Sequence, residues 1–224
     1  MAYTINKERT APIYGVLFDM DGVVLDSEVL YARFWAEAAH ALGYPMTYEQ
    51  ALGMRSLSGS AGQAKLESYF GPGVSRNVMR DKRVELMDAY VAEHGIDAKP
   101  GIAALLDALK ERGIRCAIAT SSPKERAIQY LTHLGLAEKF DAICSGYEVA
   151  KGKPAPDIYL VAAESIGLKP ENCLAVEDSF PGILSAYRAG CHPVLVPDLD
   201  GSTEEMRKIL YAESDTLPEL LELL

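Results

Sequence analysis

The stretch VLFDMDGVVLDSE, residues 16–28, places two carboxylates directly behind an apolar run. The apolar residues lead into Asp19, and Asp21 and Gly22 follow at once. A continuous apolar run, rather than an alternating one, is typical of a strand buried on both faces of a parallel sheet. Two acids this close repel each other, so the strand end that carries them needs a compensating positive group.

The same type of apolar run recurs further along the chain. The runs span residues 14–19, 115–120, 141–145, 173–178 and 193–197. Helical patterns lie between them, with apolar stripes at Ile102, Leu105, Leu106 and Leu109 and at Ile128, Leu131 and Leu134, and with Pro181 and Gly190 bracketing a third helix. Strand alternating with helix at this spacing predicts the α/β class, an open parallel Rossmann-like sheet with right-handed crossovers.

One long segment interrupts this alternation. Residues 27–97 contain no convincing strand and read as helices punctuated by Gly and Pro. We therefore expect an α/β core domain built from residues 1–26 and 98–224, with a small α-helical domain, residues 27–97, inserted after the first strand.

Composition narrows the classes of partner. The chain has 224 residues, 49% hydrophobic and 24% charged, with a formal net charge of -10. Nucleic acid and anionic membrane surfaces are disfavoured, because binding phosphate backbones needs clustered Lys and Arg. Residues 1–12 hold no apolar segment of signal-peptide length, and no run reaches the roughly 20 apolar residues of a membrane span. Four widely spaced cysteines favour free thiols in a reducing cytoplasm.

Polar residues end several of the predicted strands. Asp19 and Asp21 follow the first, Thr120 and Ser121 the second, and Glu177 and Asp178 the fourth. Taken alone, Asp-x-Asp-Gly is about as compatible with a helix cap or turn as with a site. Together these residues fall at the carboxyl edge of one sheet, where such folds bind ligands.

Several carboxylates at one edge cannot all be ionised without a cation between them. An all-oxygen site is what Mg²⁺ prefers. We expect the ion to lie between Asp19 and Asp178, with the Asp21 backbone carbonyl as a further ligand and Glu177 either as a ligand or just behind the ligands.

A lysine is expected beside the acids. Lys153, in KGKPAPDIY, precedes a Pro-x-Pro helix start just beyond the third strand, and Lys151 is the competing candidate. Such a lysine is ordinarily a solvated loop residue, but next to an acid cluster it would neutralise carboxylate or phosphate charge. A nucleophilic carboxylate, a metal, a lysine and hydroxyl donors together suit phosphoryl transfer.

Four motifs occur in order: FDMDG at 18–22, ATSS at 119–122, GKPAPD at 152–157 and AVEDS at 175–179. This arrangement resembles the haloacid dehalogenase superfamily, in the branch of β-phosphoglucomutase-like phosphatases with a helical cap. The resemblance covers nearly the whole chain beyond the first dozen residues.

The resemblance implies a role for each residue at the strand ends. Asp19 would be the nucleophile that forms a phosphoaspartyl intermediate, and Asp21 the general acid and base. Thr120, the Ser121 backbone N–H and Lys153 would bind the phosphate. Because dehalogenation in this superfamily needs no acid at the second position, the presence of Asp21 favours phosphoryl transfer.

The predicted insert supplies three candidate substrate contacts: Arg55, Glu28 and Tyr31. Mutases of this branch carry a histidine where this chain has Tyr31, and tyrosine is a poor base at pH 7. We therefore expect a Mg²⁺-dependent phosphatase acting on a small phosphorylated metabolite, most simply a sugar phosphate, with no protein partner evident. A hexose-phosphate mutase is the alternative, and a non-catalytic binding protein on the same fold is a third hypothesis.

Overall fold

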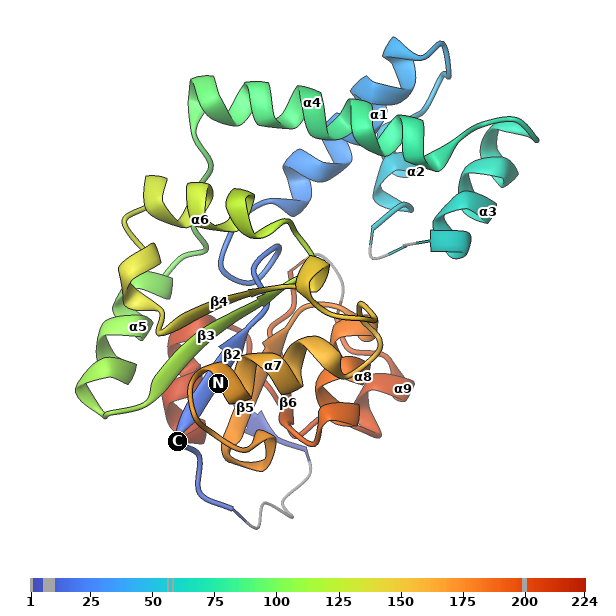
Figure 1. Ribbon diagram of the computed structural model, residues 1–224. Coiled ribbons are helices and arrows are strands. Elements are labelled where there is room, and N and C mark those ends of the chain that lie inside the picture. The colour runs from blue at the N-terminus through green and yellow to red at the C-terminus, as the bar shows by residue number, and fades with distance from the viewer. Residues whose placement is uncertain (1, 6–10, 56, 58, 199–200) are drawn as a thin grey trace. The chain divides into compact units, whose positions relative to one another are not determined.

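The computed structural model describes residues 2–5, 11–55, 57, 59–198 and 201–224 (Figure 1). Internal contacts divide the chain into two compact units. The first unit comprises Met1–Leu25 and Asp97–Leu224, and the second comprises Asp26–Ile96. Each unit has its own buried apolar cluster.

The first unit is built on a sheet of the order β1-β7-β6-β5-β2-β3-β4. Its strands are β1 (Tyr3–Thr4), β2 (Gly15–Phe18), β3 (Arg115–Thr120), β4 (Ala142–Ser145), β5 (Cys173–Glu177), β6 (His192–Leu195) and β7 (Ala212–Glu213). All neighbouring pairs are parallel except β1 with β7. The five apolar runs predicted as strands are β2 to β6, which confirms the parallel α/β class. The two-residue strands β1 and β7 were not predicted, because so short a segment carries no periodic pattern.

Helices and short 3₁₀ turns connect these strands. The helices are α5 (Ile102–Glu111), α6 (Lys124–His133), α7 (Asp157–Ser165), α8 (Phe180–Ala189) and α9 (Glu204–Arg207), with 3₁₀ turns η1 (Ala137–Lys139), η2 (Gly146–Glu148), η3 (Pro170–Asn172) and η4 (Leu217–Leu223). Helices α7 and α8 pack on one face of the sheet, against alternate residues such as Leu17, Ala117 and Ala175 (Figure 1).

The predicted helical stripes are largely confirmed. On α5, Ile102, Leu105, Leu106 and Leu109 are all buried. On α6 the prediction was wrong for Ile128, which is 42% exposed; Ala127, Tyr130 and Leu131 form the buried face instead. Residues 127, 130 and 131 follow the i, i+3, i+4 spacing of one helix face, and a search for aliphatic residues alone misses the alanine and the tyrosine on it.

Helices, joined by turns and irregular stretches, make up the regular secondary structure of the described residues of the second unit. It contains α1 (Glu28–Ala41), α2 (Tyr48–Leu52), α3 (Gly59–Phe70) and α4 (Arg76–His94). Thr47 caps the N-terminus of α2 in a capping box with Gln50, and Ser75 caps the N-terminus of α4. The core of the unit contains mainly alanine and methionine side chains, packed with a tryptophan and a leucine: Ala32, Trp35, Ala38, Met46, Met54, Leu66 and Met79.

None of the helices in the described part of the chain combines the length and apolarity that crossing a bilayer would require. All four cysteines are free and buried: Cys116, Cys144, Cys173 and Cys191.

Candidate active site

Asp19 and Asp21 lie in a tight turn that follows strand β2. Strand β2 ends at Phe18, and the amides of Val24 and Leu25 both donate to the Met20 carbonyl. Gly22 adopts a φ of 80°, a left-handed conformation that costs little without a side chain. The turn therefore places Asp19 and Asp21 at the carboxyl end of a central strand.

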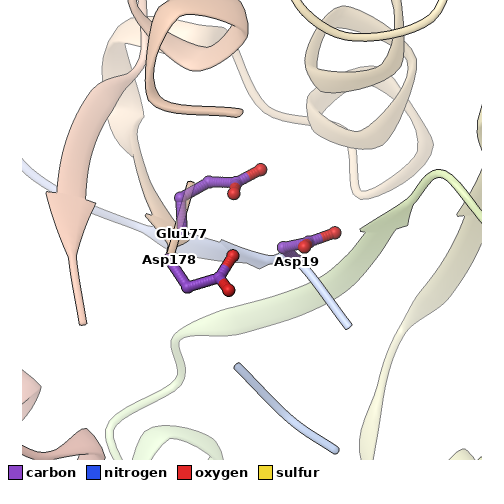
Figure 2. Close-up of side chains that lie close together, drawn as sticks. All are labelled: Asp19, Glu177 and Asp178. Carbon is purple, nitrogen blue, oxygen red and sulfur yellow. The ribbon is translucent and has the colours of Figure 1, made fainter. Parts of the chain in front are cut away.

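The neighbouring strand β5 brings two further acids to the same edge. Because β2 and β5 pair in parallel register, Phe18 lies opposite Val176, and the residues that follow each strand meet. Carboxylate oxygens of Asp19, Glu177 and Asp178 all lie within 4.8 Å of one another. Figure 2 shows these three carboxylates gathered at the ends of their strands.

Lys153 supplies the positive charge. Its Nζ donates to Asp19 Oδ1 at 2.7 Å and to Glu177 Oε1 at 2.6 Å. Its loop is held from α8, where Ser185 Oγ donates to the Ala155 carbonyl and Arg188 Nη1 to the Pro154 carbonyl. The Lys153–Pro154 peptide bond is cis. Lys151, the competing candidate, is exposed, so the structure brings Lys153 to the acids.

Glu177 is enclosed on every side. It is the last residue of β5 and has no exposed surface. Its Oε1 accepts from Lys153 and from the Tyr159 hydroxyl, at 2.6 Å in both cases, and its Oε2 accepts from Ser179 Oγ at 3.2 Å. A Cβ at Gly182 would lie 1.9 Å from Glu177 Cδ, so only glycine at that position of α8 leaves room for this carboxylate.

The end of β3 forms a short polar loop beside Asp21. Thr120 Oγ1 accepts from the Ser122 amide at 3.0 Å, and Ser122 Oγ donates to Asp21 Oδ2 at 3.0 Å. Ser145, at the end of β4, fixes the loop by donating to the Ser122 carbonyl at 2.7 Å. Ser121 is exposed at the tip of this loop.

The electrostatics reflect an excess of acids over bases. Burial raises the pKa of Asp19 from 3.8 to about 7, and the nearby charges of Glu177 and Asp21 act in the same direction, against the opposing effect of Lys153. Burial alone would lower the pKa of the Lys153 ammonium, but its attraction to Asp19 and Glu177 outweighs that effect and raises it. The ammonium therefore stays charged, and the site still favours additional positive charge.

The donor set at this edge fits a hard divalent cation. The three clustered residues offer only carboxylate oxygens, which Mg²⁺ prefers over nitrogen or sulfur ligands. The raised pKa of Asp19 is what an acid cluster shows before a cation neutralises it. Both oxygens of Glu177 accept hydrogen bonds from neighbouring side chains, and one oxygen of Asp19 accepts from Lys153.

The other sequence candidates lie in the second unit. Glu28 is the first residue of α1, and Arg55 Nε donates to the Leu52 carbonyl at 3.1 Å. Tyr31 has the Arg83 guanidinium 4.4 Å from its ring centroid. Arg83 also lies 5.3 Å from the Trp35 ring, and its Nε has no hydrogen-bond partner among the described residues.

The structure thus brings together Asp19, Lys153, Glu177 and Asp178, and separately Asp21 with the loop after β3. Sequence reasoning missed Tyr159, Ser179 and Gly182 as neighbours of the site, and it placed Ser122 at the edge without a function.

Comparisons with known proteins agree with this geometry. Residues 13–190 match the family model of the haloacid dehalogenase-like hydrolases. The chain is 35% identical to hexitol phosphatase A of Escherichia coli, over 81% of this chain and 82% of that protein. It is 32% identical to β-phosphoglucomutase of Bacillus subtilis, over 80% of this chain and 81% of the relative.

A solved structure shares nearly the whole architecture. A variant of CbbY from Rhodobacter sphaeroides in complex with xylulose-(1,5)bisphosphate superposes with a TM-score of 0.76 at 28% identity, covering 93% of this chain and 96% of CbbY. The motif order, the parallel sheet, the acids grouped at its carboxyl edge and the family match all agree, and the chain belongs to the haloacid dehalogenase-like hydrolases.

Proposed function

We propose that this protein is a Mg²⁺-dependent phosphatase that hydrolyses a small phosphorylated metabolite, a sugar phosphate, through a phosphoaspartyl intermediate on Asp19. The observation that carries the proposal is the Asp19 carboxylate bonded to a buried ammonium, Lys153, within a cluster of further carboxylates. Named relatives that act on phosphorylated carbohydrates support the choice of substrate class.

In the first half-reaction a carboxylate oxygen of Asp19 attacks phosphorus. The bond between phosphorus and the leaving oxygen breaks, and that oxygen takes a proton from Asp21. Ser122, which follows the neighbouring strand β3, donates to Asp21 at 3.0 Å and so orients it without supplying a charge. An ammonium has three N–H donors. Lys153 directs one at Asp19 and one at Glu177, and the third is available to a phosphate oxygen.

In the second half-reaction water replaces the sugar as the reacting partner. Asp21, now ionised, removes a proton from the water, whose oxygen attacks phosphorus. The bond to the Asp19 oxygen breaks, and inorganic phosphate leaves. Thr120, with a hydroxyl proton to donate, and the Ser121 N–H lie on the loop after β3 and would bind the phosphate oxygens.

Asp19, Asp178 and the Asp21 carbonyl would hold Mg²⁺. When bound, the ion would neutralise the carboxylates and the charge that develops on the transferring phosphoryl group. We assign the helical unit of residues 27–97 the part of a cap, with Arg55, Glu28 and Tyr31 as candidate substrate contacts. Four free, buried cysteines are consistent with a reducing compartment such as the cytoplasm.

A hexose-phosphate mutase is the second candidate, supported by the similarity to β-phosphoglucomutase. It requires a base that helps a substrate hydroxyl attack the phosphoaspartate. Tyr31 occupies the relevant position by the motif alignment and is a poor base at pH 7. Interconversion of β-glucose 1-phosphate and glucose 6-phosphate, with a bisphosphate activator, would favour the mutase over the phosphatase.

The test is hydrolysis of p-nitrophenyl phosphate and of a panel of sugar phosphates, with and without Mg²⁺. Turnover should require the metal and should vanish in Asp19→Asn while the circular dichroism spectrum is retained. Asp107→Asn is the matched control, because this aspartate lies on α5 and pairs with Lys139 at the surface. Unchanged turnover in Asp19→Asn would remove the nucleophile assignment, and a folded wild-type protein with no turnover on any substrate would favour the non-catalytic alternative.

A further inference from the structure

We propose that Tyr159 is a positioning residue that holds Lys153 against Asp19 by fixing Glu177, the second carboxylate to which Lys153 donates. The kinetic part of this inference rests on the proposed phosphatase function, whereas its structural part does not. Tyr159 lies on α7 with no exposed surface, and no sequence motif of the site includes it.

The contact chain is short and continuous. The Tyr159 hydroxyl donates to Glu177 Oε1 at 2.6 Å, and the same oxygen accepts from Lys153 Nζ at 2.6 Å. Lys153 then donates to Asp19 Oδ1 at 2.7 Å. Three links therefore connect a phenol to the carboxylate proposed as the nucleophile, all between side chains that are nearly or fully buried.

Tyr159 also contacts the lysine directly. Lys153 Nζ lies 5.2 Å from the centroid of the Tyr159 ring, within the range of a cation–π interaction. Both residues come from the same segment, since α7 begins at Asp157, directly after the loop that carries Lys153. The ring limits where the ammonium can lie, and the hydroxyl limits where its acidic partner can lie.

A neutral donor suits this position for a physical reason. Lysine is a point charge on a flexible stem, so its location depends on what holds its partners. A second cation at Glu177 would compete with Lys153 for the carboxylate. A phenol is neutral, so it fixes the position of the carboxylate by a hydrogen bond and leaves the negative charge to Lys153. Ser179 completes the arrangement on the other oxygen at 3.2 Å.

Removing only the phenolic oxygen tests the inference. Tyr159→Phe keeps the ring and its packing but leaves Glu177 Oε1 with Lys153 as its remaining donor. The ammonium should then shift toward Glu177 and away from Asp19. Because misplaced reacting groups affect the chemical step more than binding, kcat should fall about tenfold while KM changes less than about twofold.

The matched control is Tyr130→Phe. Tyr130 is also a buried tyrosine of the first unit, 2% exposed, but it lies on α6. Both variants lose one buried hydroxyl, so both should lower the melting temperature. Only Tyr159→Phe should change kcat.

A second readout does not depend on turnover. The Lys153 ammonium should give a signal in ¹H–¹⁵N spectra selective for lysine NH₃⁺ groups, assigned by its disappearance in Lys153→Met. That signal should move or broaden in Tyr159→Phe and stay in place in Tyr130→Phe. Should Tyr159→Phe fail to fold, Ser179→Gly removes the donor to Glu177 Oε2 at little cost to the helix cap, and a smaller shift is expected.

The outcomes separate the two proposals. A shifted Lys153 signal in a protein without phosphatase activity would support the positioning inference and contradict the proposed function. An unmoved Lys153 signal in folded Tyr159→Phe would overturn the positioning inference whatever the activity. A shifted signal with unchanged kcat would overturn the link between lysine position and catalysis.

Discussion

Two buried cations, one in each unit of the molecule, are stabilised in opposite ways. Lys153 in the first unit has a side chain only 8% exposed and donates to two carboxylates. Arg83 in the second unit is 9% exposed and lies over the rings of Tyr31 and Trp35, with its Nε unpartnered among the described residues. One cation is held by ion pairs and the other by aromatic faces.

The difference decides how much the surroundings of each cation lose when that cation is removed. Removing one partner of a buried ion pair leaves the other charge uncompensated, so the acids around Lys153 depend on it for stability as well as for chemistry. Aromatic rings lose little when a cation leaves them. Lys153 is thus held by the charges of Asp19 and Glu177, whereas Arg83 is held by the faces of two rings.

Lys153→Met should have the largest effect. It leaves Asp19 and Glu177 buried without their counter-charge, so the free energy of unfolding should fall by about 3–5 kcal/mol. Loss of a charged donor to the transferring phosphate should lower kcat by about 10²–10³-fold. Urea unfolding and steady-state kinetics measure the two effects.

The matched control is Lys151→Met, since Lys151 lies two positions away and is exposed. It should leave both quantities nearly unchanged. Near-normal turnover in Lys153→Met would mean that the buried ion pair serves the fold alone, and the contrast with Arg83 would lose its functional meaning.

Gly182→Ala should displace Glu177, and through it Lys153, by steric contact from helix α8. The added Cβ would meet Glu177 Cδ at 1.9 Å, so the carboxylate must move and carry Lys153 with it. We expect overpacking to cost about 1–3 kcal/mol of stability. A displacement of this size can lower turnover by about 10²-fold. Gly201→Ala is the control, because a Cβ there meets nothing within 4 Å. Equal kinetics in the two variants would show that Glu177 adapts without affecting the site.

The pH dependence of stability should reveal the excess of acid. The folded pKa of Asp19 is about 7 against 3.8 unfolded, so between these values the folded state keeps a proton that the unfolded state has released. In metal-free solution this carboxyl should therefore lower stability as pH rises through that window, by up to about 1.4 kcal/mol per pH unit.

Urea unfolding of the wild type and Asp19→Asn, both in EDTA, isolates this contribution as the difference between the two curves. Adding Mg²⁺ above pH 7 should stabilise the wild type more than the variant, because the ion compensates the carboxylates. A difference that does not change with pH would show that Lys153 alone neutralises Asp19.

Arg83→Met should have the smallest effect on stability, within about 1 kcal/mol, because apolar replacement of a buried charge is often neutral or stabilising. Arg80→Met is the control on the same helix, where the arginine pairs with Asp81 at 2.7 Å near the surface. A large loss of stability in urea unfolding of Arg83→Met would reverse the comparison.

Much of the core was predictable from the sequence because strand periodicity and strand ends are local properties. Five apolar runs predicted strands β2 to β6, and the polar residues that follow them predicted which side chains would meet. The choice between Lys151 and Lys153 stayed open in the sequence, and the structure decides it, because Lys151 is exposed and Lys153 donates to Asp19. The error at Ile128 arose because the buried face of α6 contains an alanine and a tyrosine, Ala127 and Tyr130, where the prediction looked for aliphatic residues.

The sequence by itself determined the class of fold and the residues at the sheet edge, because both follow from short-range patterns of apolar and polar side chains. Only the tertiary structure decided how the charges are shared. That Glu177 binds Lys153, Tyr159 and Ser179 at once depends on β5, α7 and α8 meeting at one point, with a glycine where they are closest. Likewise, that Arg83 lies on rings depends on α1 packing against α4. Apart from the contact of Ser179 with Glu177, these contacts join residues from different elements, and no local pattern specifies them.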